Sequence, residues 1–229
     1  MILLKKIKTY LDKHGMVKTL LHAFDRLGLS FYYRKIFFLS KDLDSCLSKD
    51  NLGLELTMKK INRNDLEEME EFYDGWRNKG KALKHLTGHK HLYSLSNHKT
   101  DYAYTWVDKE ESEIEYFNIR YSLPRGTVSL AYNYVVPEHR GKGMATHSAK
   151  SVMGLYREYG FKRMITVVEP KNKASLRVKE KLGFSECGKC IYIRFLFIKL
   201  YYCRKSDKPS KIFTKLGMDG KEIVNYFIK

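Results

Sequence analysis

The sequence lacks long hydrophobic runs and has little cysteine. No segment reaches the roughly 18 to 20 uninterrupted apolar residues that a membrane-spanning helix needs. The amino-terminal segment is not typical of a signal peptide, because lysines interrupt its apolar run and no small-residue cleavage site follows. Four cysteines in 229 residues are too few for a disulfide framework. We therefore expect a cytoplasmic protein with reduced thiols and no membrane-spanning segment.

The sequence is also poor in metal-ligand patterns. Cys187 and Cys190 form a Cys-x-x-Cys pair, but no second pair or His-x-x-x-His motif completes a zinc site. Both thiols lead into an apolar stretch, so we expect them to pack in the core. The three histidines at 85, 89 and 91 have no acidic or cysteine ligand beside them. We expect no metal site.

The most informative segment is residues 135 to 145, with the sequence VVPEHRGKGMA. An apolar strand end runs into an Arg-Gly-Lys-Gly turn, and a helical stretch follows. Gly141 and Gly143 can adopt positive φ and carry no Cβ, so successive backbone N–H groups can converge on an anion at the positive end of a helix. Arg140 and Lys142 add positive charge. A glycine pair alone is more often part of an ordinary tight turn.

A second segment follows about 27 residues later. Asn172 and Ser175 precede the sequence Glu-Lys-Leu-Gly-Phe at 180 to 184, which closes a short helix at a glycine. The two segments in this order resemble the GNAT superfamily of acyl-CoA-dependent N-acyltransferases. In that family the first segment binds the CoA pyrophosphate and the second flanks the pantetheine arm. The resemblance implies acetyl-CoA as co-substrate and ten binding residues: Val135, Val136, Arg140, Gly141, Lys142, Gly143, Met144, Ala145, Asn172 and Ser175.

The sequence divides into three parts. Residues 1–50 carry two amphipathic helical patterns, an aromatic strand at 31–39 and a polar linker. Residues 51–204 are expected to form the acyltransferase domain, and residues 205–229 a short helix or add-on. The predicted fold is α/β (α+β), a GNAT-like mixed and mostly antiparallel sheet with a splayed parallel strand pair, flanking helices and an N-terminal helical extension.

Patterns within residues 51–204 predict the individual elements. We expect helices at 66–76, capped by Asn64 and Asp65, and at 79–86, 144–159 and 174–182. We expect strands at 54–58, 91–95, 101–107, 116–121, 127–136, 163–168 and 191–200. A turn at Asn97-His98 and a loop from 108 to 115 connect some of them.

The family's chemistry is direct attack of an amine on the thioester. It needs a base, a donor to the developing oxyanion and an acid for the thiolate. A backbone N–H near Val135 is the expected donor. The strand 128–136 contains no carboxylate, so Glu115, with Glu113 as an alternative, is the candidate base. Lys179 stands where the family commonly has tyrosine.

Three candidate acids follow. Lys179 is one, although a helix lysine is more often solvated. Tyr192 and Tyr156 are the others, although tyrosines usually pack. The tyrosines and tryptophan at 102, 104, 106, 132 and 134 fall on strand faces that could line a substrate cleft, or could simply belong to the core.

The composition carries 43 basic and 26 acidic residues, giving a formal net charge of +17. This excess indicates an anionic partner such as CoA, nucleic acid, an anionic membrane or an acidic substrate, or else a lysine-rich solvated surface. The leading hypothesis is an acetyl-CoA-dependent N-acetyltransferase acting on a small-molecule amine. The alternative is a catalytically weak binding module on nucleic acid or an anionic membrane. Residues 1–30 are candidates for peripheral contact with an anionic membrane or for packing on the protein itself. Nucleic acid is not the expected partner of the enzyme. The sequence leaves open whether the protein forms a homodimer.

Overall fold

The computed structural model describes residues 31–45, 56–69, 72, 78–97, 100–114, 119–195, 198–205 and 211–215. The two helices expected before residue 30 lie outside these residues. So do Glu115, the second residue of the Asn97-His98 turn, and most of the carboxyl-terminal tail.

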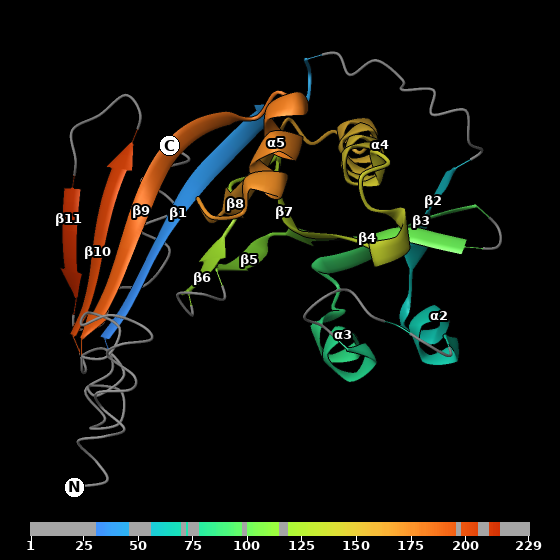
Figure 1. Ribbon diagram of the computed structural model, residues 1–229, viewed down its shortest axis with the longest axis horizontal. Coiled ribbons are helices and arrows are strands. Elements are labelled where there is room, and N and C mark those ends of the chain that lie inside the picture. The colour runs from blue at the N-terminus through green and yellow to red at the C-terminus, as the bar shows by residue number, and fades with distance from the viewer. Residues whose placement is uncertain are drawn as a thin grey trace, which may run out of the picture.

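A nine-stranded mixed sheet forms the centre of the described structure, in the order β11-β10-β9-β1-β8-β7-β4-β3-β2 (Figure 1). All neighbouring strands in it are antiparallel except β7 and β8. The strands are β1 (Phe31–Asp42), β2 (Thr57–Ile61), β3 (Lys90–Asn97), β4 (Thr100–Lys109), β7 (Thr127–Val135), β8 (Arg163–Val168), β9 (Ser185–Phe195), β10 (Ile198–Lys205) and β11 (Lys211–Lys215). A separate hairpin pairs β5 (Glu111–Ile114) with β6 (Ile119–Ser122).

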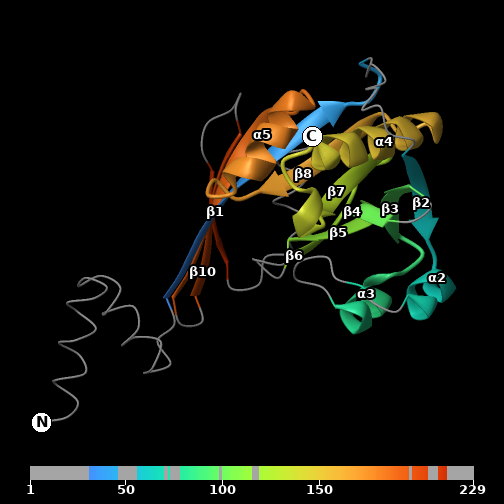
Figure 2. The same cartoon turned by 45° about the vertical axis from the view of Figure 1, so that its right-hand side comes forward.

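Helices cover both faces of this sheet. Helices α4 (Met144–Glu158) and α5 (Lys173–Lys181) lie on one side, and α2 (Arg63–Glu68) and α3 (Lys79–His85) lie on the other (Figure 2). Beneath these two helices, Met153 of α4 and Val128 of β7 belong to one buried hydrophobic cluster. On the opposite face, Leu66 and Ala82 pack with Trp106. The mixed sheet with a parallel pair and flanking helices agrees with the predicted fold class.

The parallel pair separates after a short contact. Strands β7 and β8 pair only from Thr127 to Ser129, opposite Arg163 to Ile165, although both continue beyond. At the point of separation, the Thr166 hydroxyl donates to the Leu130 carbonyl at 2.9 Å. A bulge interrupts the pairing of β7 with β4 between Leu130 and Tyr132. The two strands therefore diverge toward their carboxyl ends, as the sequence predicted.

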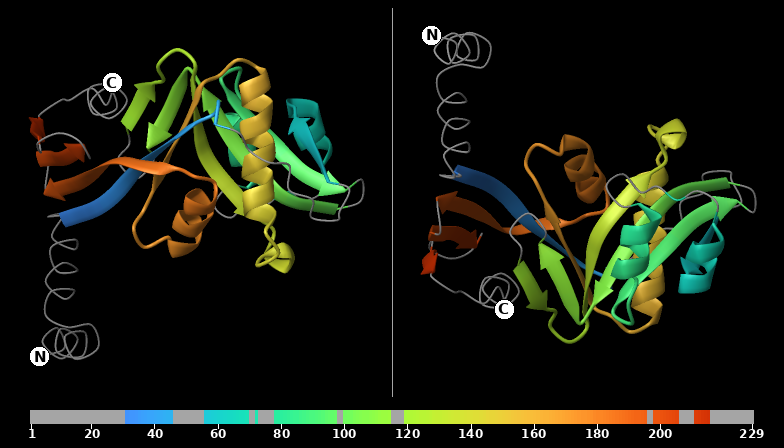
Figure 3. Two further views of the ribbon diagram at one scale, coloured as in Figure 1. Left: turned by 90° about the horizontal axis from the view of Figure 1, so that it is seen from above. Right: turned by 90° about the horizontal axis from the view of Figure 1, so that it is seen from below.

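Strand β1 is an interior strand of the sheet. It is inserted between β8 and β9, antiparallel to both, and Figure 3 shows it running alongside β9. Ile36, Phe38 and Leu39 of this strand are buried. The sequence analysis predicted the strand itself but assigned it to an extension ahead of the acyltransferase domain. Residues 31–42 instead pack as an integral part of the same sheet.

Most elements from 127 to 184 match the prediction within one or two residues, and four others differ. The predicted strand 191–200 is two strands, β9 and β10, which pair with each other. The region 108–115, expected as a loop, contains the end of β4 and all of β5. Strand β2 begins at Thr57 rather than at residue 54, and residues 211–215 of the tail form a strand.

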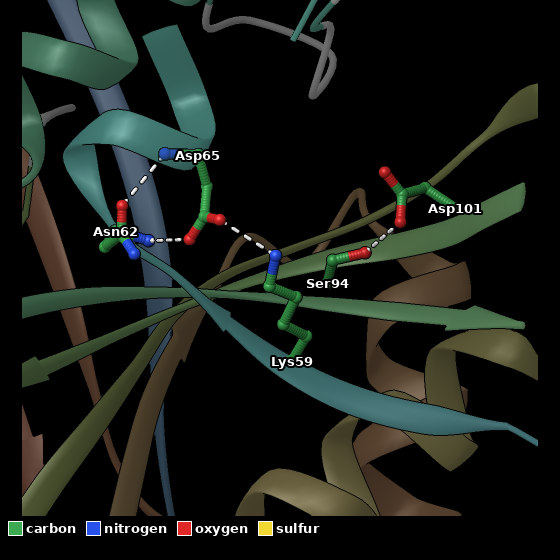
Figure 4. A network of polar contacts seen from close by, with 5 residues as sticks. All are labelled: Lys59, Asn62, Asp65, Ser94 and Asp101. Atoms are coloured by element: carbon green, nitrogen blue, oxygen red, sulfur yellow. Dashed lines mark hydrogen bonds and ion pairs between the residues drawn. The ribbon is translucent and has the colours of Figure 1, made fainter. Parts of the chain in front are cut away.

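The first helix also differs from its prediction. It begins at Arg63 and is capped by Asn62, not by Asn64 and Asp65 (Figure 4). The Asn62 side chain accepts from the Asp65 N–H at 2.8 Å, while the Asp65 carboxylate accepts from the Asn62 N–H at 2.9 Å. A hydrogen bond from Lys59 at 2.8 Å and the bond from Asn62 lower the pKa of Asp65. A reciprocal capping box of this kind satisfies two helix-end donors, which fixes the helix start three residues earlier than expected.

Candidate functional site

The Arg-Gly-Lys-Gly turn joins the end of β7 to the start of α4. A single 3-10 turn, η2 (Pro137–His139), follows Val136, and the chain then reaches Gly141 and Gly143 with φ of 77° and 81°. Gly143 is the amino-terminal cap residue of α4 in the left-handed conformation. A side chain at either glycine would be strained there, so the sequence and the backbone geometry agree.

The turn presents unpaired backbone donors. Within the described residues, the N–H groups of Gly141 to Ala145 have no hydrogen-bond acceptor, and the first paired donor is Thr146 N–H, 3.0 Å from the Gly143 carbonyl. These donors lie at the positive end of a fifteen-residue helix. All three residues from Gly141 to Gly143 are exposed. The turn therefore has the geometry of an anion-binding site.

Two basic side chains are fixed beside these donors. The Arg140 Nε donates to the Val135 carbonyl at 3.1 Å, and its guanidinium lies 5.5 Å from the centre of the Tyr134 ring. The Lys142 Nζ donates to the Glu138 carbonyl at 3.2 Å. Both residues are exposed, so their charge is available to a bound anion.

The end of β7 faces the gap between β7 and β8. The N–H of Val136 donates to the Tyr102 carbonyl of β4 at 3.0 Å. Successive N–H groups along a strand point to opposite edges, so the N–H of Val135 points toward the gap. The Asn133 amide donates to the Ala145 carbonyl at 3.1 Å and ties this part of β7 to the first turn of α4. The first turn of α4, which follows the anion turn, is thus held against the end of β7.

Helix α5 begins on the far side of the gap. Asn172 is its cap residue, and its side chain accepts from the Ser175 N–H at 3.0 Å. The Asn172 N–H donates to the Glu169 carbonyl at 2.9 Å, in the turn that leaves β8. Asn172 is exposed and Ser175 partly buried. Capping explains the asparagine at position 172, whatever ligand it contacts, but not the serine at 175, which contributes only its backbone N–H.

Lys179 is buried, whereas a helix lysine is usually solvated. Only 4% of its surface is exposed, and its ammonium lies 5.4 Å from the centre of the Phe184 ring. Among the described residues it has no ion-pair partner. Burial without a counter-ion disfavours the charged form and lowers the pKa of Lys179 to about 7. A group with this pKa can hold or release a proton near neutral pH.

Tyr192 lies on the opposite face of the sheet from Lys179. It is buried in a cluster with Ile36 and Ile165, and its ring stacks on Tyr201 with centroids 4.9 Å apart. Leu182 and Phe184, which follow Lys179, belong to the cluster beneath α4 and α5. The structure therefore does not bring these two predicted acids together.

The alternative acid Tyr156 is part of a buried polar group. Its hydroxyl lies 3.0 Å from His91 Nδ1 and 3.2 Å from the Tyr93 hydroxyl. Burial raises the pKa of Tyr156 well above its ordinary value and lowers the pKa of His91 to about 4. A fully buried tyrosine in the core beneath α4 is not suited to proton transfer at the gap.

The remaining candidates, the two glutamates proposed as base and the five aromatic residues, do not form one cluster either. Glu113 of β5 lies 3.9 Å from Lys90 Nζ and 3.7 Å from Arg120 Nε, and Glu115 lies outside the described residues. Of the aromatic set, Tyr104, Trp106 and Tyr134 are core residues beneath α2 and α3. Tyr132 is partly buried against the same cluster, and Tyr102 contacts His139 edge to face.

The candidate metal ligands do not converge in the described residues. No group of three or more His, Cys, Asp or Glu side chains could hold a metal ion there. The His85 ring contacts Trp106, while His89 pairs with Glu110 at 2.9 Å. Cys190 is fully buried and Cys187 donates to the Phe38 carbonyl at 3.2 Å, in agreement with the expected packing role. No described helix combines the length and apolar character needed to cross a bilayer.

One feature of the gap was not found from the sequence. Glu169, the first residue after β8, forms an ion pair with Arg34 of β1 at 3.1 Å. The two residues are 135 positions apart in the chain, and neither belongs to a recognisable motif. Only the insertion of β1 beside β8 could have revealed the contact.

Comparison with known proteins assigns the family. A family model described as an acetyltransferase (GNAT) domain matches residues 56–185, more than half of the chain. The protein therefore belongs to the GNAT acetyltransferase domain family. No curated protein sequence shows significant similarity to the chain.

One solved structure among those compared supports the same fold, at low sequence identity. A GCN5-related N-acetyltransferase from Sphaerobacter thermophilus is 14% identical, with a TM-score of 0.51, over 78% of this chain and 56% of that one. The chain thus spans little more than half the length of that protein. The ribosomal-protein-S18-alanine N-acetyltransferase of Escherichia coli is 14% identical, with a TM-score of 0.43, over 57% and 77% of the two chains. The aminoglycoside N-acetyltransferase AAC(6')-Iy in complex with CoA is 17% identical, with a TM-score of 0.44, over 58% and 89%. Only the first of these likenesses is close enough to support the fold.

Proposed function

We propose that the protein is an acetyl-CoA-dependent N-acetyltransferase that acts on a primary amine. The observation that carries this proposal is the turn from Gly141 to Ala145, whose unpaired N–H groups lie at the mouth of the gap between β7 and β8. In this proposal, the turn, with Arg140 and Lys142, holds the CoA pyrophosphate. The pantetheine arm then follows the open edge of β7 at Val135 and Val136, and passes the first turn of α5 at Asn172 and Ser175.

Direct transfer needs no covalent enzyme intermediate. The amine nitrogen attacks the thioester carbonyl, the oxygen gains charge near the Val135 N–H, and the C–S bond then breaks. The departing thiolate takes a proton, and the amine nitrogen loses one. Lys179 is the better-supported proton donor, because its lowered pKa lets an ammonium give up a proton near neutral pH. Tyr192 is the second candidate donor, and Glu115 remains the proposed base.

The acceptor is proposed to be a small-molecule amine. Two of the structural neighbours act on an aminoglycoside and on a ribosomal-protein alanine according to their names, which describe those proteins alone. Fold does not select among amino sugars, amino acids, polyamines and protein amino termini.

Two observations favour a second function. Strand β7 carries no carboxylate and the chain has a net charge of +17. A binding module that attaches to nucleic acid or anionic lipid would show both features. It would bind polyanions with a steep dependence on salt and would release no thiol with any amine.

The test is calorimetric titration with CoA. The double variant Arg140→Ala, Gly143→Val removes one cation and forces a β-branched residue into a left-handed conformation. We expect CoA to bind it roughly 10- to 100-fold more weakly, because charge-assisted hydrogen bonds contribute about 1.5 to 3 kcal/mol. The matched control is Arg157→Ala, Gly160→Val, since Gly160 has φ of 81° at the other end of α4. Equal binding by wild type and the first variant would contradict the proposal.

Turnover is measured separately as thiol release from acetyl-CoA with a panel of amines. Release that depends on one amine class and is lost in the Arg140 and Gly143 variant supports the enzyme. CoA binding without release by any amine favours the binding module.

A further inference from the structure

Beyond the end of β8, strand β1 lines one side of the gap. Phe37 pairs with Val168, the last residue of β8, so residues 31–36 extend past it. On the other side β7 continues to Val135. The open part of the gap therefore lies between β7 and β1, with Glu169 at the point where β8 ends. Strand β1 lies outside residues 56–185, the segment matched by the family model.

Glu169 and Arg34 lie on the sheet face opposite α4 and α5. Side chains alternate along a strand, and Ile165 and Val167 of β8 contact the cluster on that face. Glu169 continues their alternation. On β1, Arg34 continues the alternation of Ile36 and Phe38, which belong to the same cluster. The pair is thus on the opposite side of the sheet from α4, whose amino terminus forms the anion turn.

Arg34 is held in place from two directions. Its Nε donates to the Tyr32 hydroxyl at 2.8 Å, and its guanidinium lies 5.2 Å from the centre of the Tyr32 ring. Its Nη1 lies 3.1 Å from Glu169 Oε1. Tyr192, the predicted acid, is the direct cross-strand partner of Arg34. The ion pair orients Glu169 Oε1, which is buried and accepts no hydrogen bond from the described residues, whereas the Glu169 side chain as a whole is 19% exposed and that of Arg34 36%.

A carboxylate at this position supplies a counter-charge for a cationic acceptor amine. A primary amine is a cation at neutral pH, and a protein with a net charge of +17 repels it. No acidic residue occurs in β7, in β8 or in residues 31–36 of β1, which together border the gap. Glu169 is the residue directly after β8.

We propose that Glu169, oriented by Arg34, is the subsite that binds the cationic amino group of the acceptor. The carboxylate accepts hydrogen bonds from the ammonium and places the nitrogen on the face of the gap opposite α4. The inference rests on the proposed acetyltransferase function and assigns to it acceptors that arrive with a free, charged primary amine.

The experiment measures amine binding directly, without turnover. Wild type and Glu169→Gln are each saturated with CoA and titrated by calorimetry with five probes: spermidine, tobramycin, glucosamine, lysine amide and a short peptide with a free amino-terminal alanine. We expect at least one probe to bind the wild-type complex. The same probe should bind Glu169→Gln roughly 10- to 100-fold more weakly, as the loss of a charge-assisted hydrogen bond implies.

Two measurements separate the possible failures. CoA affinity should be the same in wild type and Glu169→Gln, which also shows that the variant is folded. The matched control is Glu186→Gln, which removes a carboxylate paired with Lys189 at 3.2 Å on β9 and should bind the probe like wild type. If no probe binds the CoA complex, or if Glu169→Gln binds as tightly as wild type, the subsite is refuted while the CoA proposal stands. If wild type does not bind CoA, the proposed function itself fails.

Discussion

Lys179 provides the sharpest test of the electrostatics of the site. Its ammonium is buried beside Phe184 and has no ion-pair partner among the described residues. The pKa falls from 10.5 to about 7 on folding because burial removes water from the charged form. Between these two values the unfolded chain binds more protons at this residue than the folded chain. The contribution of Lys179 to stability therefore becomes more favourable as the pH rises from 7 toward 10.5.

The variant Lys179→Met keeps an unbranched side chain, one heavy atom shorter than that of lysine, and removes the titrating group. The lowered pKa corresponds to a cost of roughly 5 kcal/mol at pH 6 at most, and of about 2 kcal/mol at pH 9. We therefore expect Lys179→Met to be more stable than wild type at pH 6, and this advantage to shrink by about 2 to 3 kcal/mol by pH 9. The packing of the apolar methionine side chain adds to the difference in unfolding free energy by an amount that does not depend on pH.

The assay is urea unfolding of both proteins at pH 6, 7, 8 and 9. The quantity of interest is the difference in unfolding free energy at each pH, because other groups titrate equally in both proteins. The control is Lys181→Met, an exposed lysine two residues further along the same helix. Its difference from wild type should be small and independent of pH. A pH-independent difference for Lys179→Met would refute the lowered pKa and, with it, the suitability of this lysine as an acid near neutral pH.

Two further predictions concern stability around the site. Asn172→Ala removes the side chain that caps α5, so the free energy of unfolding should fall by about 1 kcal/mol in urea titrations, while Ser175→Ala, which keeps the capped N–H, should change it less. His91 is held neutral by burial with a pKa of about 4, so it lowers stability as the pH falls from 6.5 toward 4. His91→Gln should therefore show a smaller loss of thermal stability between pH 6.5 and 4.5 than wild type, and an equal loss in both proteins would contradict this.

The elements around the anion turn were predictable because local signals agree there. Strand β7, the turn, α4, β8 and α5 each combine a clear apolar period with a strong stop signal. Gly141 and Gly143 need their positive φ, and Asn172 caps the helix that follows. Each of these features depends on a few neighbouring residues, so it can be predicted from the local sequence.

The features that were missed depend on contacts between distant residues. Lys179 has the sequence context of a solvated helix lysine, and only the packing of α5 against the sheet buries it. The run from 190 to 203 is apolar and aromatic apart from Arg194 and Lys199, so no periodicity marks the break between β9 and β10. The Arg34 and Glu169 pair depends on the position of β1, which no local pattern encodes.

The position of β1 leads to a last prediction, about the boundary of the folding unit. The sequence places the acyltransferase domain at 51–204, but β1 supplies the antiparallel partner of both β8 and β9. Removing residues 1–42 would expose the backbone edges of those strands. It would also delete three buried side chains, Ile36, Phe38 and Leu39.

Each of these side chains contributes roughly 1.5 to 3 kcal/mol, so their loss alone approaches the 5 to 15 kcal/mol that typically stabilises a domain. We expect a 43–229 fragment to lack a cooperative thermal transition, whereas a 31–229 fragment keeps one. The second fragment is the control, because it removes the amino-terminal segment but retains β1. A 43–229 fragment that unfolds cooperatively near the wild-type temperature would show that β1 is an accessory strand. If it also bound CoA like wild type, the family-matched segment would form the CoA site without the strand that carries Arg34.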